Sequence, residues 1–89
     1  MLVEKNIKII NKLGIHVRPS TQIADITNKH QSKIVFIKDG LEINARSIIE
    51  LLTLAAGCNA DITIRAEGDD AEAVVNAVIK LVESKFGEE

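Results

Sequence analysis

The Asp39-Gly40 dipeptide limits the possible folds of this chain more than any other feature of its sequence. It separates two β-like runs, residues 33–38 and 41–43, in which apolar side chains dominate. A two-residue hairpin turn requires positive φ at both central positions, and Asp-Gly is among the sequences that adopt it most readily. The two runs are therefore predicted to be antiparallel neighbours in a β-sheet.

Two further strands are predicted from alternating apolar and polar side chains. The alternation covers residues 3–10, although Lys5 interrupts it, and residues 61–67. In the later run the inward side chains are predicted to be Ile62, Ile64 and Ala66. The open face of the sheet is predicted to carry three polar side chains: Lys8, Thr63 and Arg65.

Capping signals and one proline predict the first two helices. Pro19 is tolerated only in the first turn of a helix, which places the first helix at about residues 17–29. Ser47 and Glu50 have the three-residue spacing of a capping box, in which each side chain bonds to the backbone N–H of the other. The second helix is predicted to begin there and to stop at Gly57.

A third helix is predicted near the C-terminus, with Asp69 as its cap and Glu72 completing a second capping box. Apolar side chains then recur at helical spacing: Ala73, Val74, Ala77, Val78, Leu81 and Val82. The element order is β-α-β-β-α-β-α. This order predicts a single α+β domain over residues 1–89, an open-faced two-layer sandwich with three helices on one face of a four-stranded antiparallel sheet.

Charge and composition exclude several classes of function. The net charge is −2, and the only aromatic residues are two Phe, so neither a basic surface nor stacking side chains for nucleic acid are expected. Cys58 is the only cysteine and no long apolar run is present. We therefore expect a cytoplasmic protein without disulfides or membrane insertion.

The candidate site lies in residues 14–20, Gly-Ile-His-Val-Arg-Pro-Ser. His16 stands where Pro19 predicts a helix to begin, and the N-terminus of a helix attracts anions. Taken alone, a histidine is more often packed or solvated than reactive. Here its neutral imidazole could accept a phosphoryl group, held by the N–H groups of Val17 and Arg18 and by the Arg18 guanidinium. No cofactor, metal ligand set or acid–base pair is evident nearby, which is typical of a carrier rather than an enzyme.

Residues 14–20 resemble the active-site motif of HPr, the histidine-containing phosphocarrier of the phosphoenolpyruvate-dependent sugar phosphotransferase system. Gly40 and residues 44–48 and 66–68 resemble later landmarks of the same family. The resemblance implies an open-faced β-sandwich and a phosphoryl group carried on the δ (pros) nitrogen of His16. It also implies enzyme I as the donor and an enzyme IIA domain as the acceptor.

The second helix is apolar on nearly every side, so part of it is predicted to remain exposed. The alternative is that all of its apolar residues lie in the core. The family resemblance implies a docking surface for partner proteins at four positions: Thr21, Ile48, Ile49 and Leu52. A carrier of this size that must expose its site is expected to be a monomer.

Ser47 matches the regulatory serine that HPr kinase/phosphorylase modifies in many members of the family. It is also predicted to be a helix cap, and Glu50 is predicted to repel a phosphate placed on it. We therefore expect Ser47 to be a poor phosphorylation site. Two alternatives to the sugar branch stay open: a carrier in a regulatory, nitrogen-type phosphorelay, and a regulatory binding module of the same fold.

Overall fold

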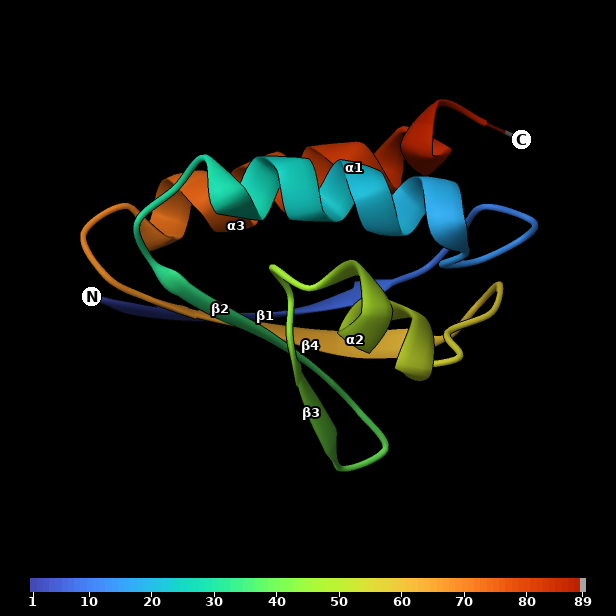
Figure 1. The fold of residues 1–89 in the computed structure, drawn as a ribbon, viewed down its shortest axis with the longest axis horizontal. Coiled ribbons are helices and arrows are strands. Elements are labelled where there is room, and N and C mark those ends of the chain that lie inside the picture. Colours follow the sequence, from blue (N-terminus) through green and yellow to red (C-terminus); the bar gives the residue numbers. More distant parts are fainter. Residues whose placement is uncertain (89) are drawn as a thin grey trace.

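The computed structural model describes residues 1–88 and has the element order predicted from the sequence (Figure 1). The strands are β1 (Leu2–Lys8), β2 (Lys33–Lys38), β3 (Leu41–Asn44) and β4 (Asp61–Glu67). The helices are α1 (Val17–Asn28), α2 (Ile48–Thr53), α3 (Ala71–Glu83) and a final 3-10 turn, η1 (Lys85–Gly87). Within this described part, no helix is both long and apolar enough to cross a membrane.

All strand pairs in the four-stranded sheet are antiparallel, and the strand order is β1-β4-β2-β3. The predicted hairpin joins β2 to β3, with Lys38 opposite Leu41. Its two turn residues both have positive φ, +51° at Asp39 and +83° at Gly40, as the turn chemistry requires. The N-terminal strand β1 lies at the edge of the sheet beside β4.

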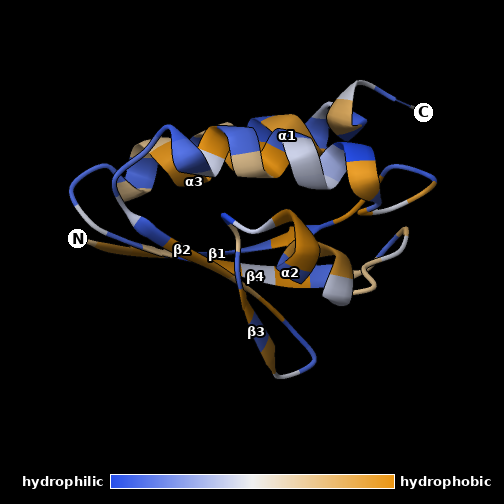
Figure 2. Cartoon of the chain, viewed as in Figure 1, coloured by the Kyte–Doolittle hydropathy of each residue, from blue (hydrophilic) through white to orange (hydrophobic). Residues whose placement is uncertain are grey.

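The core lies between the sheet and the two long helices, which run side by side over one face of it (Figures 1 and 2). Ile62, Ile64 and Ala66 of β4 face this core, as predicted. In α3 the buried positions are Ala71, Val74, Val75, Val78 and Val82. Ala73, which the predicted apolar spacing includes, is exposed, and Val75 is buried instead.

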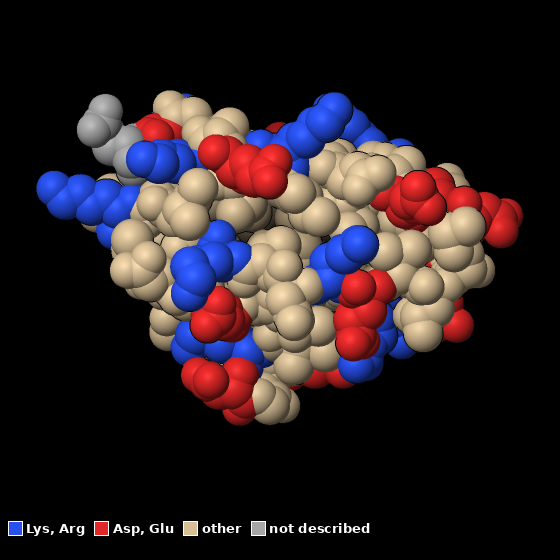
Figure 3. All heavy atoms as spheres, turned by 180° about the vertical axis from the view of Figure 1, so that it is seen from behind, with Lys and Arg blue, Asp and Glu red and all other residues tan. Residues whose placement is uncertain are grey.

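The other face of the sheet carries the predicted polar side chains. Lys8 pairs with Asp61 at 3.1 Å. Arg65 Nε lies 2.9 Å from a carboxylate oxygen of Glu4, and the Thr63 hydroxyl donates to Asn6. Such cross-strand pairs support the register of β1 against β4. Seen from behind, basic and acidic side chains are interspersed over the surface (Figure 3).

Two helix ends differ from the prediction. The cap of α3 is Asp70 rather than Asp69, and its carboxylate does not bond to the helix it precedes. It accepts instead from the backbone N–H groups of Gln31 and Ser32, at 2.8 and 2.9 Å. The helix α2 ends at Thr53 rather than at Gly57, so it has only six residues.

Candidate functional site

The loop before α1 is fixed against the loop that follows α2. Gly14 has a φ of +70°, and a β-carbon built on it would lie 2.3 Å from the carbonyl oxygen of Ala56. The same carbonyl oxygen accepts a hydrogen bond of 2.8 Å from the N–H of Ile15, which is buried. The glycine therefore allows the close approach that presents His16, two residues later, at the start of the helix.

His16 is the N-cap of α1, as Pro19 predicts, and its carbonyl oxygen accepts the helical hydrogen bond from Ser20 at 3.0 Å. Its side chain does not cap the helix. The backbone N–H groups of Val17 and Arg18 have no acceptor among residues 1–88. These unpaired donors and the helix dipole make the first turn favourable for an anion.

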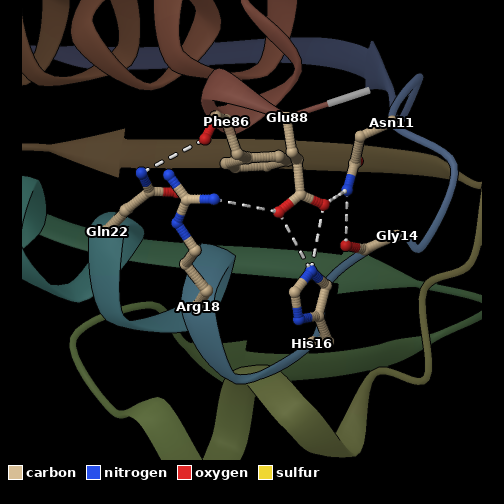
Figure 4. Close-up of polar contacts among 7 residues, drawn as sticks. All are labelled: Asn11, Gly14, His16, Arg18, Gln22, Phe86 and Glu88. Atoms are coloured by element: carbon tan, nitrogen blue, oxygen red, sulfur yellow. Dashed lines mark hydrogen bonds and ion pairs between the residues drawn. The ribbon is translucent and has the colours of Figure 1, made fainter.

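The ring of His16 meets a carboxylate that sequence reasoning missed. Its Nε2 lies 3.0 and 3.2 Å from the two carboxylate oxygens of Glu88 (Figure 4). The buried Asn11 amide donates to the same carboxylate at 2.9 Å and to the Gly14 carbonyl at 2.8 Å. Two hydrogen bonds hold the pKa of Glu88 below its ordinary value: the one from His16 has the larger effect and the one from Asn11 the smaller.

Arg18 lies beside the same carboxylate, with a guanidinium nitrogen 3.8 Å from a carboxylate oxygen of Glu88 (Figure 4). Its side chain is 59% exposed, and that of His16 is 36% exposed. The structure thus brings together His16, Arg18 and the N–H groups of the first turn, as the sequence predicts. The site thus consists of a partly exposed imidazole beside three groups that can donate hydrogen bonds to phosphate oxygens: the N–H groups of Val17 and Arg18 and the Arg18 guanidinium.

The C-terminal segment reaches this site because Phe86 anchors it. The Phe86 side chain is fully buried, and its carbonyl oxygen accepts from the Gln22 side chain of α1 at 3.2 Å (Figure 4). Lys85 and Phe86 both have a φ of +57°. An isolated apolar residue among polar ones at the chain end is the only sequence signal for this anchor.

The four predicted docking residues all lie on the surface: Thr21, Ile48, Ile49 and Leu52. Ile49 is the most exposed of the apolar three, at 77%. Leu51, on the opposite side of α2, is fully buried, so this helix is part core and part exposed apolar surface. Since α2 packs against α1, the exposed residues lie near the helix that begins at His16. Their role in docking stays a prediction.

The predicted capping box at Ser47 is only half formed. The Ser47 hydroxyl accepts from the Glu50 N–H at 3.2 Å, as expected. The Glu50 carboxylate, however, accepts from the backbone N–H of Asn44 at 3.0 Å rather than from that of Ser47. The Ser47 N–H donates to the carbonyl oxygen of Asn44. Glu50 therefore secures the turn before the helix.

Comparisons with known proteins agree with this fold. The family model described as "PTS HPr component phosphorylation site" matches residues 3–84. "Phosphocarrier protein HPr" of Treponema pallidum is 34% identical over 99% of this chain and 100% of its own length. "Phosphocarrier protein NPr" of Shewanella violacea is 34% identical over 97% of this chain and 94% of its own. The crystal structure of HPr-C-His from Thermoanaerobacter tengcongensis superposes with a TM-score of 0.94, at 39% identity and 98% coverage of both chains.

Proposed function

The chain belongs to the HPr family of phosphotransferase-system phosphocarriers, and from this premise we propose that His16 is its phosphoryl acceptor. The donor is phosphorylated enzyme I, and the recipient is an enzyme IIA domain of the sugar branch. The protein acts as a stoichiometric cytoplasmic carrier and a monomer, and its partners supply the rest of the chemistry. Ser47 is at most a secondary regulatory site.

One observation carries this proposal: the His16 ring stands half exposed beside unpaired donors at the first turn of α1. In the transfer, the Nδ1 lone pair attacks phosphorus as the bond from phosphorus to the donor breaks. The Val17 and Arg18 N–H groups and the Arg18 guanidinium then meet the charge on the phosphoryl oxygens. No hydrogen bond engages Nδ1 within residues 1–88, so this nitrogen is available for the attack.

Intact mass after incubation with enzyme I, magnesium and phosphoenolpyruvate tests the acceptor. At neutral pH the wild-type chain is expected to gain one acid-labile phosphoryl group, and His16→Ala is expected to gain none. His30→Ala is the matched control, because His30 is the other histidine and its Nδ1 already bonds to the Ile26 carbonyl at 2.8 Å. Equal labelling of wild type and His16→Ala would exclude His16 as the acceptor.

A carrier role in a regulatory, nitrogen-type phosphorelay is the second candidate. It is favoured by the Leu-Leu-Thr-Leu-Ala-Ala sequence of residues 51–56, which resembles the nitrogen-related branch, and by the similarity to the Shewanella violacea NPr. The presence of His16 favours either carrier over a purely regulatory binding module. Transfer rates from sugar-branch and nitrogen-branch enzyme I distinguish the two carriers, since the cognate donor gives the higher kcat/KM.

A further inference from the structure

Glu88 is held at the site from three directions. Its carboxylate accepts from Asn11 at 2.9 Å, lies 3.0 Å from His16 Nε2 and is 3.8 Å from the Arg18 guanidinium (Figure 4). Its side chain is only 15% exposed although it stands near the end of the chain. The anchored Phe86, with positive φ at two consecutive non-glycine residues, places it there. Such backbone persists only where the surroundings hold it, and it is concentrated at functional sites.

This contact makes the two ring nitrogens of His16 unequal. An ionised carboxylate can only accept hydrogen bonds, so the nitrogen facing Glu88 must carry the proton. In the neutral ring Nε2 is then N–H, and the lone pair is on Nδ1. A phosphoryl group on Nε2 would have to displace this hydrogen bond and would place two negative groups side by side.

We infer that Glu88 is a positioning residue that selects Nδ1 of His16 as the acceptor of the phosphoryl group. The inference rests on the proposed function of His16 and adds the residue that makes Nδ1, and not Nε2, the attacking nitrogen. During transfer the Nδ1–P bond forms, the bond between phosphorus and the donor breaks, and the leaving group takes the electron pair and a proton from solvent. The ring keeps its Nε2 proton and becomes positively charged, and that charge faces the Glu88 carboxylate.

Phosphoramidate tests this selection without a partner protein, since it transfers its phosphoryl group directly to imidazole and releases ammonia. The phosphohistidine isomers are then counted by ³¹P and ¹⁵N NMR on the intact chain. Wild type is expected to form mainly the Nδ1 isomer. In Glu88→Ala the Nδ1:Nε2 ratio is expected to fall about tenfold or more, as for the loss of one charged hydrogen bond.

Two variants separate selection from general effects on the chain. Glu83→Ala makes the same change at an exposed position on α3, and it is expected to keep the wild-type isomer ratio. Glu88→Gln keeps the size of the side chain but not its charge, and its ratio is expected to lie between those of wild type and Glu88→Ala. Unfolding would itself free Nε2 from Glu88 and change the ratio, so the fold of each variant is verified by circular dichroism before its isomers are counted.

An unchanged isomer ratio in Glu88→Ala would overturn the inference, and so would a wild-type chain labelled mainly on Nε2. Both results leave His16 as the phosphoryl acceptor, so the carrier function stands, and labelling on Nε2 would change only which ring nitrogen attacks. If His16 takes no phosphoryl group from any donor, the proposed function fails. The role of Glu88 can then still be tested through the NMR signal of the His16 Nε2 proton. This signal is expected to be visible in wild type and lost to exchange with water in Glu88→Ala. Equal visibility in both chains would count against the inference.

Discussion

The backbone of Gly14 lies directly against the carbonyl oxygen of Ala56. A β-carbon at Gly14 would come within 2.3 Å of that oxygen and 2.7 Å of the α-carbon of Gly57. Both obstacles are backbone atoms, so no side-chain rotation can relieve the contact. This approach joins the loop that carries His16 to the loop after α2.

Gly14→Ala is therefore expected to lower the free energy of unfolding by about 2–4 kcal/mol, since it combines a left-handed backbone with a steric overlap. Urea denaturation followed by circular dichroism measures this change. Gly57→Ala is the matched control, because a β-carbon there would meet no atom within 4 Å. Equal stability of the two variants would show that the contact at Gly14 does not constrain the loop.

Asp70 is expected to make the fold sensitive to acid. Hydrogen bonds from the Ser32 hydroxyl and from the Gln31 backbone N–H lower the pKa of Asp70 from 3.8 to about 2. Because the pKa is depressed in the folded state, the stabilisation is complete above the unfolded pKa and is lost as the pH falls through the folded value. The urea midpoint of wild type should therefore fall between pH 4 and pH 2, the interval set by these two values.

Asp70→Asn isolates this effect, because it removes the ionisable group and keeps a side chain of the same size. Its urea midpoint should change less over the same pH interval than that of wild type. Asp69→Asn removes an exposed charge one residue earlier and should retain the wild-type pH dependence. If both variants follow wild type, Asp70 is not the group responsible.

Local chemistry made most of the fold predictable. Asp39 and Gly40 determine their hairpin through backbone preferences that act within two residues, and Pro19 limits where α1 can begin. The cap of α3 was not predictable in this way. Asp69 fits the capping pattern, but Asp70 caps the helix and uses its carboxylate to bond to residues 38 and 39 positions away in the sequence.

The same limit applies to the site. His16 and Arg18 could be identified because both belong to one short motif, together with the helix N–H groups. Glu88 and Asn11 could not, because the His16–Glu88 contact spans 72 residues and the Asn11–Glu88 contact spans 77. Such contacts depend on how α3 and η1 pack beside α1, which neither periodicity nor spacing specifies.

Ile49 is expected to affect partner binding without affecting stability. Because Ile49 is 77% exposed, Ile49→Ala should change the free energy of unfolding by no more than about 0.5 kcal/mol. Leu51→Ala, in the same helix but fully buried, should lower the free energy of unfolding by about 2–5 kcal/mol.

If Ile49 contacts enzyme I, Ile49→Ala should raise the KM for the carrier in steady-state transfer assays. Leu41→Ala, an exposed apolar change on β3, is the control, and a KM equal to wild type in Ile49→Ala would exclude docking there.

Arg18→Ala is expected to slow phosphoryl transfer and leave the fold intact. The side chain is mostly exposed, so its removal should leave the urea midpoint close to wild type. Loss of one charge-assisted hydrogen bond to the phosphoryl oxygens should lower the transfer rate about 10- to 100-fold. Arg18→Lys keeps the charge but not the planar pair of donors, and it should recover part of the rate. Rapid-quench experiments measure the rate of phosphoryl transfer from enzyme I to each variant. An unchanged rate in Arg18→Ala would show that Arg18 takes no part in the transfer.

Ser47 is expected to be a poor substrate for HPr kinase/phosphorylase with ATP. Its hydroxyl already accepts from the N–H of Glu50, and the Glu50 carboxylate is held near the start of α2 by its hydrogen bond to Asn44. A phosphoserine carries nearly two negative charges, so the anchored carboxylate disfavours it. Glu50→Gln preserves an acceptor for Asn44 and removes only the charge, so it should raise the rate of Ser47 phosphorylation at least about fivefold. Glu83→Gln removes a distant charge and should have no such effect, whereas stoichiometric phosphoserine in the wild-type chain would contradict the repulsion.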